Sequence, residues 1–132
     1  IKTAAVADFR PQMPVEEKIK KDAAALSIPL ERNPDILAEL GQKKARQILV
    51  GFAAETQDLL NNARQKVQSK HLDFIVVNDI SDPAIGFASD DNRVHILDAR
   101  GQVEELPIMS KTALAAYILD RVQTLLEQRR GH

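Results

Sequence analysis

The chain of 132 residues contains no cysteine and no tryptophan, and aromatic residues make up only 4% of it. The lack of cysteine excludes disulfide frameworks, thiolate zinc sites and cysteine nucleophiles. The longest apolar runs are far shorter than the roughly 20 residues that cross a bilayer, and the first residues lack the pattern of an export signal. We therefore expect a cytoplasmic protein with no membrane partner.

An excess of charge of either sign is also lacking. Eighteen basic residues stand against nineteen acidic ones, which leaves a net charge of −1. Such a balance creates no field over the whole protein that would attract nucleic acid, so we expect no nucleic-acid partner. An anionic ligand must instead be held by a local group of basic side chains. The length and the hydrophobic fraction of 44% suit one compact globular unit.

Several motifs for phosphate, metal or acyl chemistry are missing. No GxGxxG or GxxxxGK[ST] segment occurs, so no Rossmann or Walker glycine loop of this chain holds phosphates. His71, His95 and His132 lie at unrelated positions without an HExxH pair, and there is no GxSxG segment. The pattern supports neither a zinc hydrolase nor a serine hydrolase, and we assign no residue as a metal ligand.

The middle of the chain has the pattern strand, helix, strand. Residues 47–53 form a short apolar run typical of a buried strand, and residues 73–77 repeat this signal. Between them, apolar residues recur with helical spacing up to about Lys70: Leu59, Leu60, Ala63 and Val67. This order implies a parallel strand pair with a right-handed crossover. We expect an α/β fold, a partial Rossmann-like three-layer domain with a parallel sheet.

The two ends of the chain add further elements. Residues 3–7 have the pattern of a buried strand, and residues 11–21 that of a polar loop. Residues 26–30 predict a short edge strand. The sequence Asn33-Pro34-Asp35 predicts the start of a helix that stops at Gly41.

After residue 93 the pattern predicts a hairpin and a last helix. Val94 and Ile96 alternate with polar residues, as do residues 103–106, and Arg100-Gly101 suits the turn between them. An apolar stripe then marks a helix over about residues 110–128. We therefore expect a C-terminal β-hairpin and helix after the parallel pair.

Polar and aromatic residues follow the predicted strands, where ligands bind in open α/β sheets. The first strand is followed by Asp8 and Arg10, the second carries Phe52 and Glu55, and the third ends in Asn78 and Asp79. A carboxylate can hold a hydroxyl or a metal–phosphate group, and an aromatic ring can stack on a base. The alternative is that the aspartates cap strand ends and that Phe52 belongs to the core.

Lysines form two groups that could hold phosphates. Lys18, Lys20 and Lys21 lie on the predicted loop, and Lys66 and Lys70 lie one helical turn apart on one face. Their alternative role is ordinary surface charge, which the acidic Glu16 and Glu17 would balance.

Seven segments occur together in a specific order: AAVADFRP (4–11), EKIKK (17–21), NPDIL (33–37), VGFAAET (50–56), ARQK (63–66), VND (77–79) and GFASDDN (86–92). This combination resembles the phosphopantothenoylcysteine synthetase domain, usually the C-terminal half of the bifunctional coenzyme A biosynthesis flavoprotein. The resemblance runs from Ala4 to about Asn92. It implies that residues 1–132 are the C-terminal part of the phosphopantothenate–cysteine ligase domain. Since the chain begins at Ile1 without a methionine and a strand is already expected from Thr3, we expect the upstream half of that domain to be absent.

The resemblance implies CTP-dependent ligation of 4′-phosphopantothenate to L-cysteine. The carboxylate is first activated as an acyl cytidylate with release of pyrophosphate, and the cysteine amine then displaces CMP. Mg²⁺ accompanies CTP, and the family is typically a homodimer. FMN belongs only to the decarboxylase domain, which is absent here. The asparagine that acts on the acyl cytidylate is expected in the missing upstream half, so the catalytic residues of this chain are unknown.

The resemblance also implies a set of CTP-binding residues. Asp8 would hold the ribose or the metal–phosphate group, Lys18 the triphosphate, and Phe52 would pack near the nucleotide. The helix start at Pro34 would hold the cytosine edge through backbone groups. The full set is Lys2, Thr3, Ala4, Asp8, Lys18, Pro34, Asp35, Ile36, Leu37, Phe52, Lys66 and Lys70.

Two other functions stay open. One is a non-catalytic nucleotide-binding or dimerisation module, because the apolar last helix and the hairpin could serve association. The other is a flavin-dependent decarboxylase, which rests only on association with the bifunctional protein.

Overall fold

The computed structural model describes residues 6–13, 27–81 and 91–131, and for 91 and 92 the backbone alone. The chain divides into two compact units, Ile1–Ile36 and Leu37–His132, and each is described by itself. Residues 1–5, 14–26 and 82–90, which include part of the predicted first strand and most of the predicted loop, lie outside the described residues.

The first unit contains a short antiparallel ribbon. Strand β1 (Phe9–Pro11) pairs with β2 (Leu30–Arg32). Next to the ribbon, the Asn33 N–H donates to the Asp8 carbonyl over 2.9 Å, and the Asn33 side chain donates to a second carbonyl, that of Ala7, over 2.8 Å. Asn33 therefore ties the two arms of the ribbon together.

The predicted strands of this unit differ from the strands in the described residues. Val6 and Ala7, the described residues of the predicted first strand, are exposed and precede β1, and the rest of that prediction lies outside the described residues. The predicted edge strand over residues 26–30 overlaps β2 only at its last residue. Pro29 has no N–H to donate, and its carbonyl accepts from Gln12 at the end of the ladder (2.9 Å). The regular pairing accordingly begins after Pro29.

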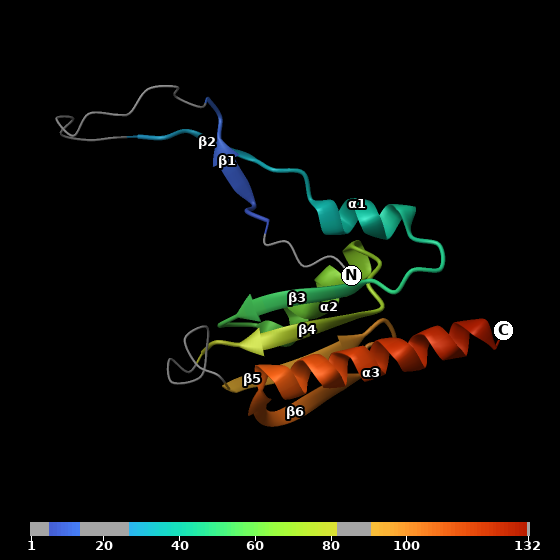
Figure 1. The fold of residues 1–132 in the computed structure, drawn as a ribbon. Coiled ribbons are helices and arrows are strands. Elements are labelled where there is room, and N and C mark those ends of the chain that lie inside the picture. The colour runs from blue at the N-terminus through green and yellow to red at the C-terminus, as the bar shows by residue number, and fades with distance from the viewer. Residues whose placement is uncertain (1–5, 14–26, 82–90, 132) are drawn as a thin grey trace. The chain divides into compact units, whose positions relative to one another are not determined.

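The second unit is a mixed four-stranded sheet covered on both faces, with strand order β3-β4-β5-β6 (Figure 1). Strands β3 and β4 are parallel and are joined by helix α2, which confirms the predicted strand, helix, strand unit. The other two strand pairs are antiparallel. From α1 (Ile36–Lys43) onward, the elements are β3 (Val50–Glu55), α2 (Leu59–Ser69), β4 (Phe74–Asp79), β5 (Asp91–Asp98), β6 (Val103–Ser110) and α3 (Lys111–Arg130).

Alternation along β4 divides the core into two layers. Ile75 and Val77 pack with α2, whereas Phe74 and Val76 face Leu114 of α3. The side chains of these four residues are each at most 2% exposed. Since successive residues of a strand point to opposite faces, α2 and α3 cover opposite sides of the sheet, as Figure 1 shows. The expected three-layer α/β arrangement is therefore present in this unit.

The predicted hairpin and last helix are also confirmed. In the turn between β5 and β6, Gly101 has a φ of +83°, a conformation that favours glycine. The Asp98 carboxylate accepts from the N–H groups of Arg100 and Gln102, both over 2.9 Å. Ser110 caps α3 by accepting from Ala113 N–H.

Helix α1 (Ile36–Lys43) differs from the prediction at both ends. It begins three residues after Asn33, whose side chain binds the Ala7 carbonyl instead of capping the helix. It also continues through Gly41, which is buried. A Cβ at this position would lie 2.0 Å from the Lys70 carbonyl oxygen. Glycine is therefore needed here for close packing rather than as a helix stop.

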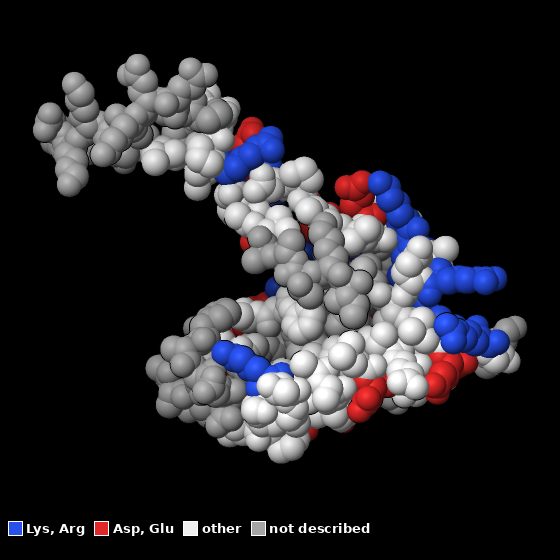
Figure 2. Space-filling model, in the orientation of Figure 1, with Lys and Arg blue, Asp and Glu red and all other residues white. Residues whose placement is uncertain are grey.

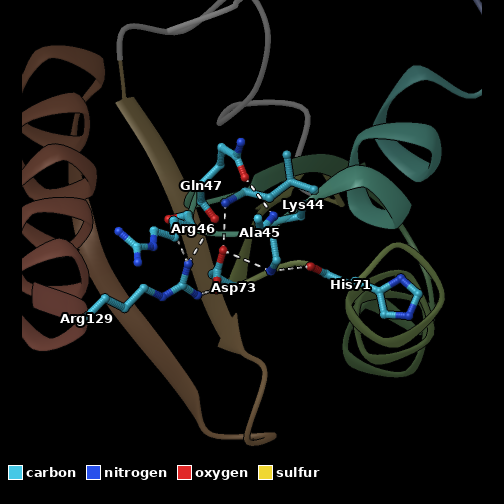
Figure 3. A network of polar contacts seen from close by, with 8 residues as sticks. Lys44, Ala45, Arg46, Gln47, His71, Asp73 and Arg129 are labelled. Atoms are coloured by element: carbon cyan, nitrogen blue, oxygen red, sulfur yellow. Dashed lines mark hydrogen bonds and ion pairs between the residues drawn. The ribbon is translucent and has the colours of Figure 1, made fainter. Parts of the chain in front are cut away.

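At the amino ends of β3 and β4, polar contacts converge on Asp73, whose side chain is 9% exposed (Figure 3). Its carboxylate accepts from Leu49 N–H over 2.7 Å and from Lys44 Nζ over 3.2 Å. It also binds Arg129, which donates to the Gln47 carbonyl as well, over 2.9 Å. This Asp73 network joins the last turn of α3 to the segment before β3.

Candidate functional site

The carboxyl ends of β3 and β4 form the candidate site. The two strands are parallel, and Glu55, the last residue of β3, is paired in register with Asp79, the last residue of β4. Ala54 and Asn78 form the pair before them. Because α2 follows β3 after a short loop, its first turns lie beside this edge, where open α/β sheets bind ligands.

Glu55, Asn62 and Lys66 form a hydrogen-bonded group that we name the Glu55 cluster. Lys66 Nζ lies 2.6 Å from Glu55 Oε1, and Asn62 Nδ2 donates to Glu55 Oε2 over 3.2 Å. The Glu55 side chain is 15% exposed and the Lys66 side chain 41% exposed. The hydrogen bond from Lys66 lowers the pKa of Glu55 below its usual range, although burial opposes the shift. The site therefore holds an ionised pair whose cationic member still reaches solvent.

The helical spacing of α2 explains how the cluster forms. Ala63 and Val67 are buried against the sheet, and Asn62 and Lys66 each precede one of them by a single residue. Residues four apart share one helix face. Docking of the apolar stripe therefore brings both polar side chains to the end of β3.

Asp79 is the second carboxylate of this edge. Hydrogen bonds from Ser81 are the main cause that lowers its pKa, and charge interactions with Arg93 and His95 contribute further. The Ser81 N–H donates to Asp79 Oδ1 over 2.9 Å. By alternation, Glu55 and Asp79 both lie on the α2 side of the sheet.

Within the described part of the chain, two buried polar atoms near this edge have no hydrogen-bond partner, Asn78 Oδ1 and His95 Nδ1. In the sheet register, Asn78 pairs with Val94 and His95 with Val77. Val94 and Val77 belong to different core layers, so the two polar residues lie on opposite faces of the sheet and do not form one site. Among the described residues, no group of three or more His, Cys, Asp and Glu side chains could hold a metal ion.

Among the described residues of the second unit, Phe52 has the most exposed large apolar side chain, at 68%. The alternative that Phe52 is a core residue is therefore wrong. It lies on the edge strand β3, whereas α3 packs on β6 at the other edge of the sheet. In the sheet register Phe52 pairs with Val76, so its ring lies on the α3 side of the sheet, opposite Glu55 and Lys66. A ligand that contacts both Phe52 and the Glu55 cluster must therefore extend around the edge strand β3.

The CTP-binding residues that the resemblance implies are distributed over both units. Lys2, Thr3, Ala4 and Lys18 lie outside the described residues. The exposed Asp8 belongs to the first unit, together with Pro34, Asp35 and Ile36. Leu37, Phe52, Lys66 and Lys70 belong to the second unit.

Within the second unit, these four residues occupy different positions. Leu37 packs against the α2 core layer, and Lys70 is the C-cap of α2, one turn after Lys66.

Asn62 is a residue of the candidate site that the sequence analysis did not identify. Its spacing of four from Lys66 was the signal that could have found it.

On the face drawn in Figure 2, the described residues carry both signs of charge. On the described residues of the face shown in Figure 2, basic side chains lie close to acidic ones rather than segregating by sign. Binding of an anion would accordingly depend on local groups such as the Glu55 cluster. No helix in the described part of the chain has the length and apolar character needed to cross a membrane.

Comparison with known proteins identifies related sequences. A family model described as the DNA/pantothenate metabolism flavoprotein C-terminal domain matches residues 1–126. The coenzyme A biosynthesis bifunctional protein CoaBC of Bacillus subtilis (strain 168) is 49% identical over 128 residues, which are 97% of this chain and 32% of that protein. A cysteine/cysteine sulfinic acid decarboxylase from an unknown prokaryotic organism is 42% identical over 96% of this chain and 35% of its own length.

A solved structure has the same fold. The crystal structure of the C-terminal domain of a coenzyme A biosynthesis bifunctional protein CoaBC matches with a TM-score of 0.72 and 38% identity. The match covers 97% of this chain and 54% of that one. The chain thus spans about a third of the two curated relatives and about half of the solved domain.

Proposed function

Because the chain belongs to the DNA/pantothenate metabolism flavoprotein C-terminal domain family, we propose that it supplies a CTP site for coenzyme A biosynthesis. The reaction is ligation of 4′-phosphopantothenate to L-cysteine. In its first step the carboxylate attacks the α-phosphorus of CTP, giving an acyl cytidylate and pyrophosphate. In the second, the cysteine amine attacks the acyl carbon and CMP leaves.

The observation that carries the proposal is the cation held at the end of β3. Lys66 is fixed by Glu55 over 2.6 Å, yet its side chain is 41% exposed. An ammonium has three donors, so donors other than the one given to Glu55 can bind phosphate oxygens. Lys66, with Lys70 one turn later, would neutralise the charge that develops on the departing pyrophosphate.

The remaining residues of the proposed site would bind the nucleoside and the other phosphates. The exposed ring of Phe52 can pack on the nucleotide. Asp8 would bind the ribose or the metal–phosphate group, and Lys18 the triphosphate. Backbone groups at the start of α1 would bind the cytosine edge, because the first N–H groups of a helix have no intrahelical partner. This part of the site comprises Pro34, Asp35, Ile36 and Leu37, with Lys2, Thr3 and Ala4 from the start of the chain.

Several properties of the whole protein are part of the proposal. Mg²⁺ would arrive with CTP as part of the substrate, since it is usually bound by substrate phosphates and one or two carboxylates. FMN would belong to the decarboxylase part of a bifunctional protein. We also propose a homodimer in the cytoplasm.

Calorimetric titration of the purified chain with Mg–CTP and with Mg–ATP tests the proposal. We expect a clear preference for CTP, and we expect Lys66→Gln or Asp8→Ala to weaken CTP binding by about tenfold, the value of a charge-assisted hydrogen bond. Lys43→Gln is the control, because Lys43 is an exposed lysine that pairs with Glu39 of its own helix. Equal affinity for both nucleotides, or unchanged binding in both site variants, would contradict the proposal.

The exposed face of α3 favours a second candidate, a non-catalytic dimerisation module. Leu119 is 53% exposed and Leu126 37% exposed. This candidate predicts no nucleotide binding and a mass that rises with protein concentration in sedimentation experiments. A flavin-dependent decarboxylase predicts a yellow protein, so a colourless purified chain would count against it.

A further inference from the structure

We propose that Glu55 and Asn62 are positioning residues that hold Lys66 ready for the terminal phosphates of CTP. The inference rests on the proposed function, because it concerns the phosphate-binding role of Lys66. It adds two residues to that site which are not among the implied CTP-binding residues.

The first step of the argument is that Glu55 has both carboxylate oxygens engaged. Oε1 accepts from Lys66 over 2.6 Å and Oε2 from Asn62 over 3.2 Å. Asn62 and Lys66 both come from α2, so one helix face fixes both ends of a carboxylate that ends β3. The Glu55 carboxylate is therefore held in one orientation, with both of its oxygens accepting hydrogen bonds from α2.

The second step concerns the entropy of lysine. A free lysine side chain samples many rotamers, and part of this conformational entropy is lost when it binds a ligand. In the Glu55 cluster this loss occurs on folding, because Glu55 already restrains the ammonium. The side chain remains 41% exposed, so the restraint does not bury the cation. The arrangement therefore presents a preorganised donor to an incoming phosphate.

The third step compares two opposite effects of Glu55 on CTP binding: repulsion of the triphosphate by its charge, and orientation of Lys66 toward the triphosphate. A carboxylate beside a triphosphate repels it, so a carboxylate that acted only through its charge would weaken CTP binding. The hydrogen bond from Lys66 keeps Glu55 ionised by lowering its pKa, and Lys66 in turn neutralises much of that charge. We infer that positioning outweighs repulsion. The two effects predict opposite changes in affinity when Glu55 is replaced.

The test measures dissociation constants for Mg–CTP and for CMP by calorimetry on the complete chain. Variants are Glu55→Gln, which removes the charge, and Asn62→Ala, which leaves the charge unchanged but releases Oε2. We expect both to raise the dissociation constant for CTP by roughly three- to tenfold, about the value of one ordinary hydrogen bond, because Lys66 keeps its charge and loses only its orientation. The dissociation constant for CMP, which lacks the terminal phosphates, should change less than about twofold.

Glu127→Gln is the matched control, since Glu127 lies on α3, on the other face of the sheet, and its carboxylate accepts a hydrogen bond from Gln123 over 2.9 Å. Tighter CTP binding by Glu55→Gln would overturn the inference in favour of repulsion. Equal weakening of CTP and CMP would overturn it in favour of a structural role, as would unchanged CTP binding in both variants. Failure of the folded parent chain to bind CTP would instead refute the proposed function itself.

Discussion

Replacement of Asp73 by alanine should destabilise the second unit strongly. The carboxylate is 9% exposed and accepts from Leu49 N–H over 2.7 Å. A hydrogen bond from a backbone N–H to a charged acceptor contributes about 1.5–3 kcal/mol. The ion pairs with Lys44 and Arg129 are partly exposed and contribute about 0.5–1 kcal/mol each. We therefore expect Asp73→Ala to lower the free energy of unfolding by about 3–4 kcal/mol.

Asp73→Asn separates the two contributions. An asparagine can keep one oxygen for Leu49 N–H, but its amide nitrogen must then face Arg129, which is also a donor. We expect a loss of about 1–2 kcal/mol, close to the value of the ion pairs alone.

Urea denaturation followed by circular dichroism measures both variants. For a chain of this length, a loss of 3 kcal/mol corresponds to a decrease in Tm of roughly 10 °C, so thermal unfolding provides a second measurement. The control is Asp120→Asn, an exposed aspartate on α3 that should change stability by less than about 0.5 kcal/mol. If Asp73→Ala unfolds within about 0.5 kcal/mol of the parent, the network does not stabilise the fold as argued.

Three further predictions concern single residues of the second unit. Gly41→Ala should lower stability by about 1–3 kcal/mol in urea denaturation despite the better helix propensity of alanine, because the Cβ would lie 2.0 Å from the Lys70 carbonyl; equal or higher stability would contradict this. Phe52→Ala should change stability by less than about 1 kcal/mol but weaken CTP binding about tenfold or more in calorimetry, since its ring is 68% exposed. The pKa of Glu55 is lowered from 4.5 mainly by Lys66, so the stability that it contributes is present above pH 4.5 and is lost as pH falls below that value. Unfolding measured between about pH 6 and about pH 3 should show a smaller decrease in Glu55→Gln than in the parent.

Local patterns were enough to predict most of the second unit. The apolar run before Phe52 and the helical spacing of Ala63 and Val67 predict β3 and α2, because each pattern reflects burial of one face. The hairpin was predictable from Gly101, whose φ of +83° matches its position in the turn. The resemblance identified the family that the comparisons show.

Contacts between distant residues could not be predicted in the same way. The ion-pair partners of Asp73, Lys44 and Arg129, are 29 and 56 residues away from it in the sequence, so no local pattern marks them. Gly41 resembles a helix stop, and only the neighbouring carbonyl of Lys70 explains why the helix continues through it. The exposure of Phe52 depends on which strand lies at the sheet edge, and this too is a property of the assembled fold. The CTP-binding residues and the assignment of residues 1–132 to part of a ligase domain stay predictions.

Gly41 also sets a spacing. With no side chain between them, the middle of α1 rests directly against the backbone at the end of α2. Leu37 lies one turn before this contact and Lys70 is the residue that makes it. In the proposed site, Leu37 belongs to the part that binds the base and Lys70 to the part that binds phosphates. The close contact would then set how near the base-binding part of the proposed site lies to its phosphate-binding part.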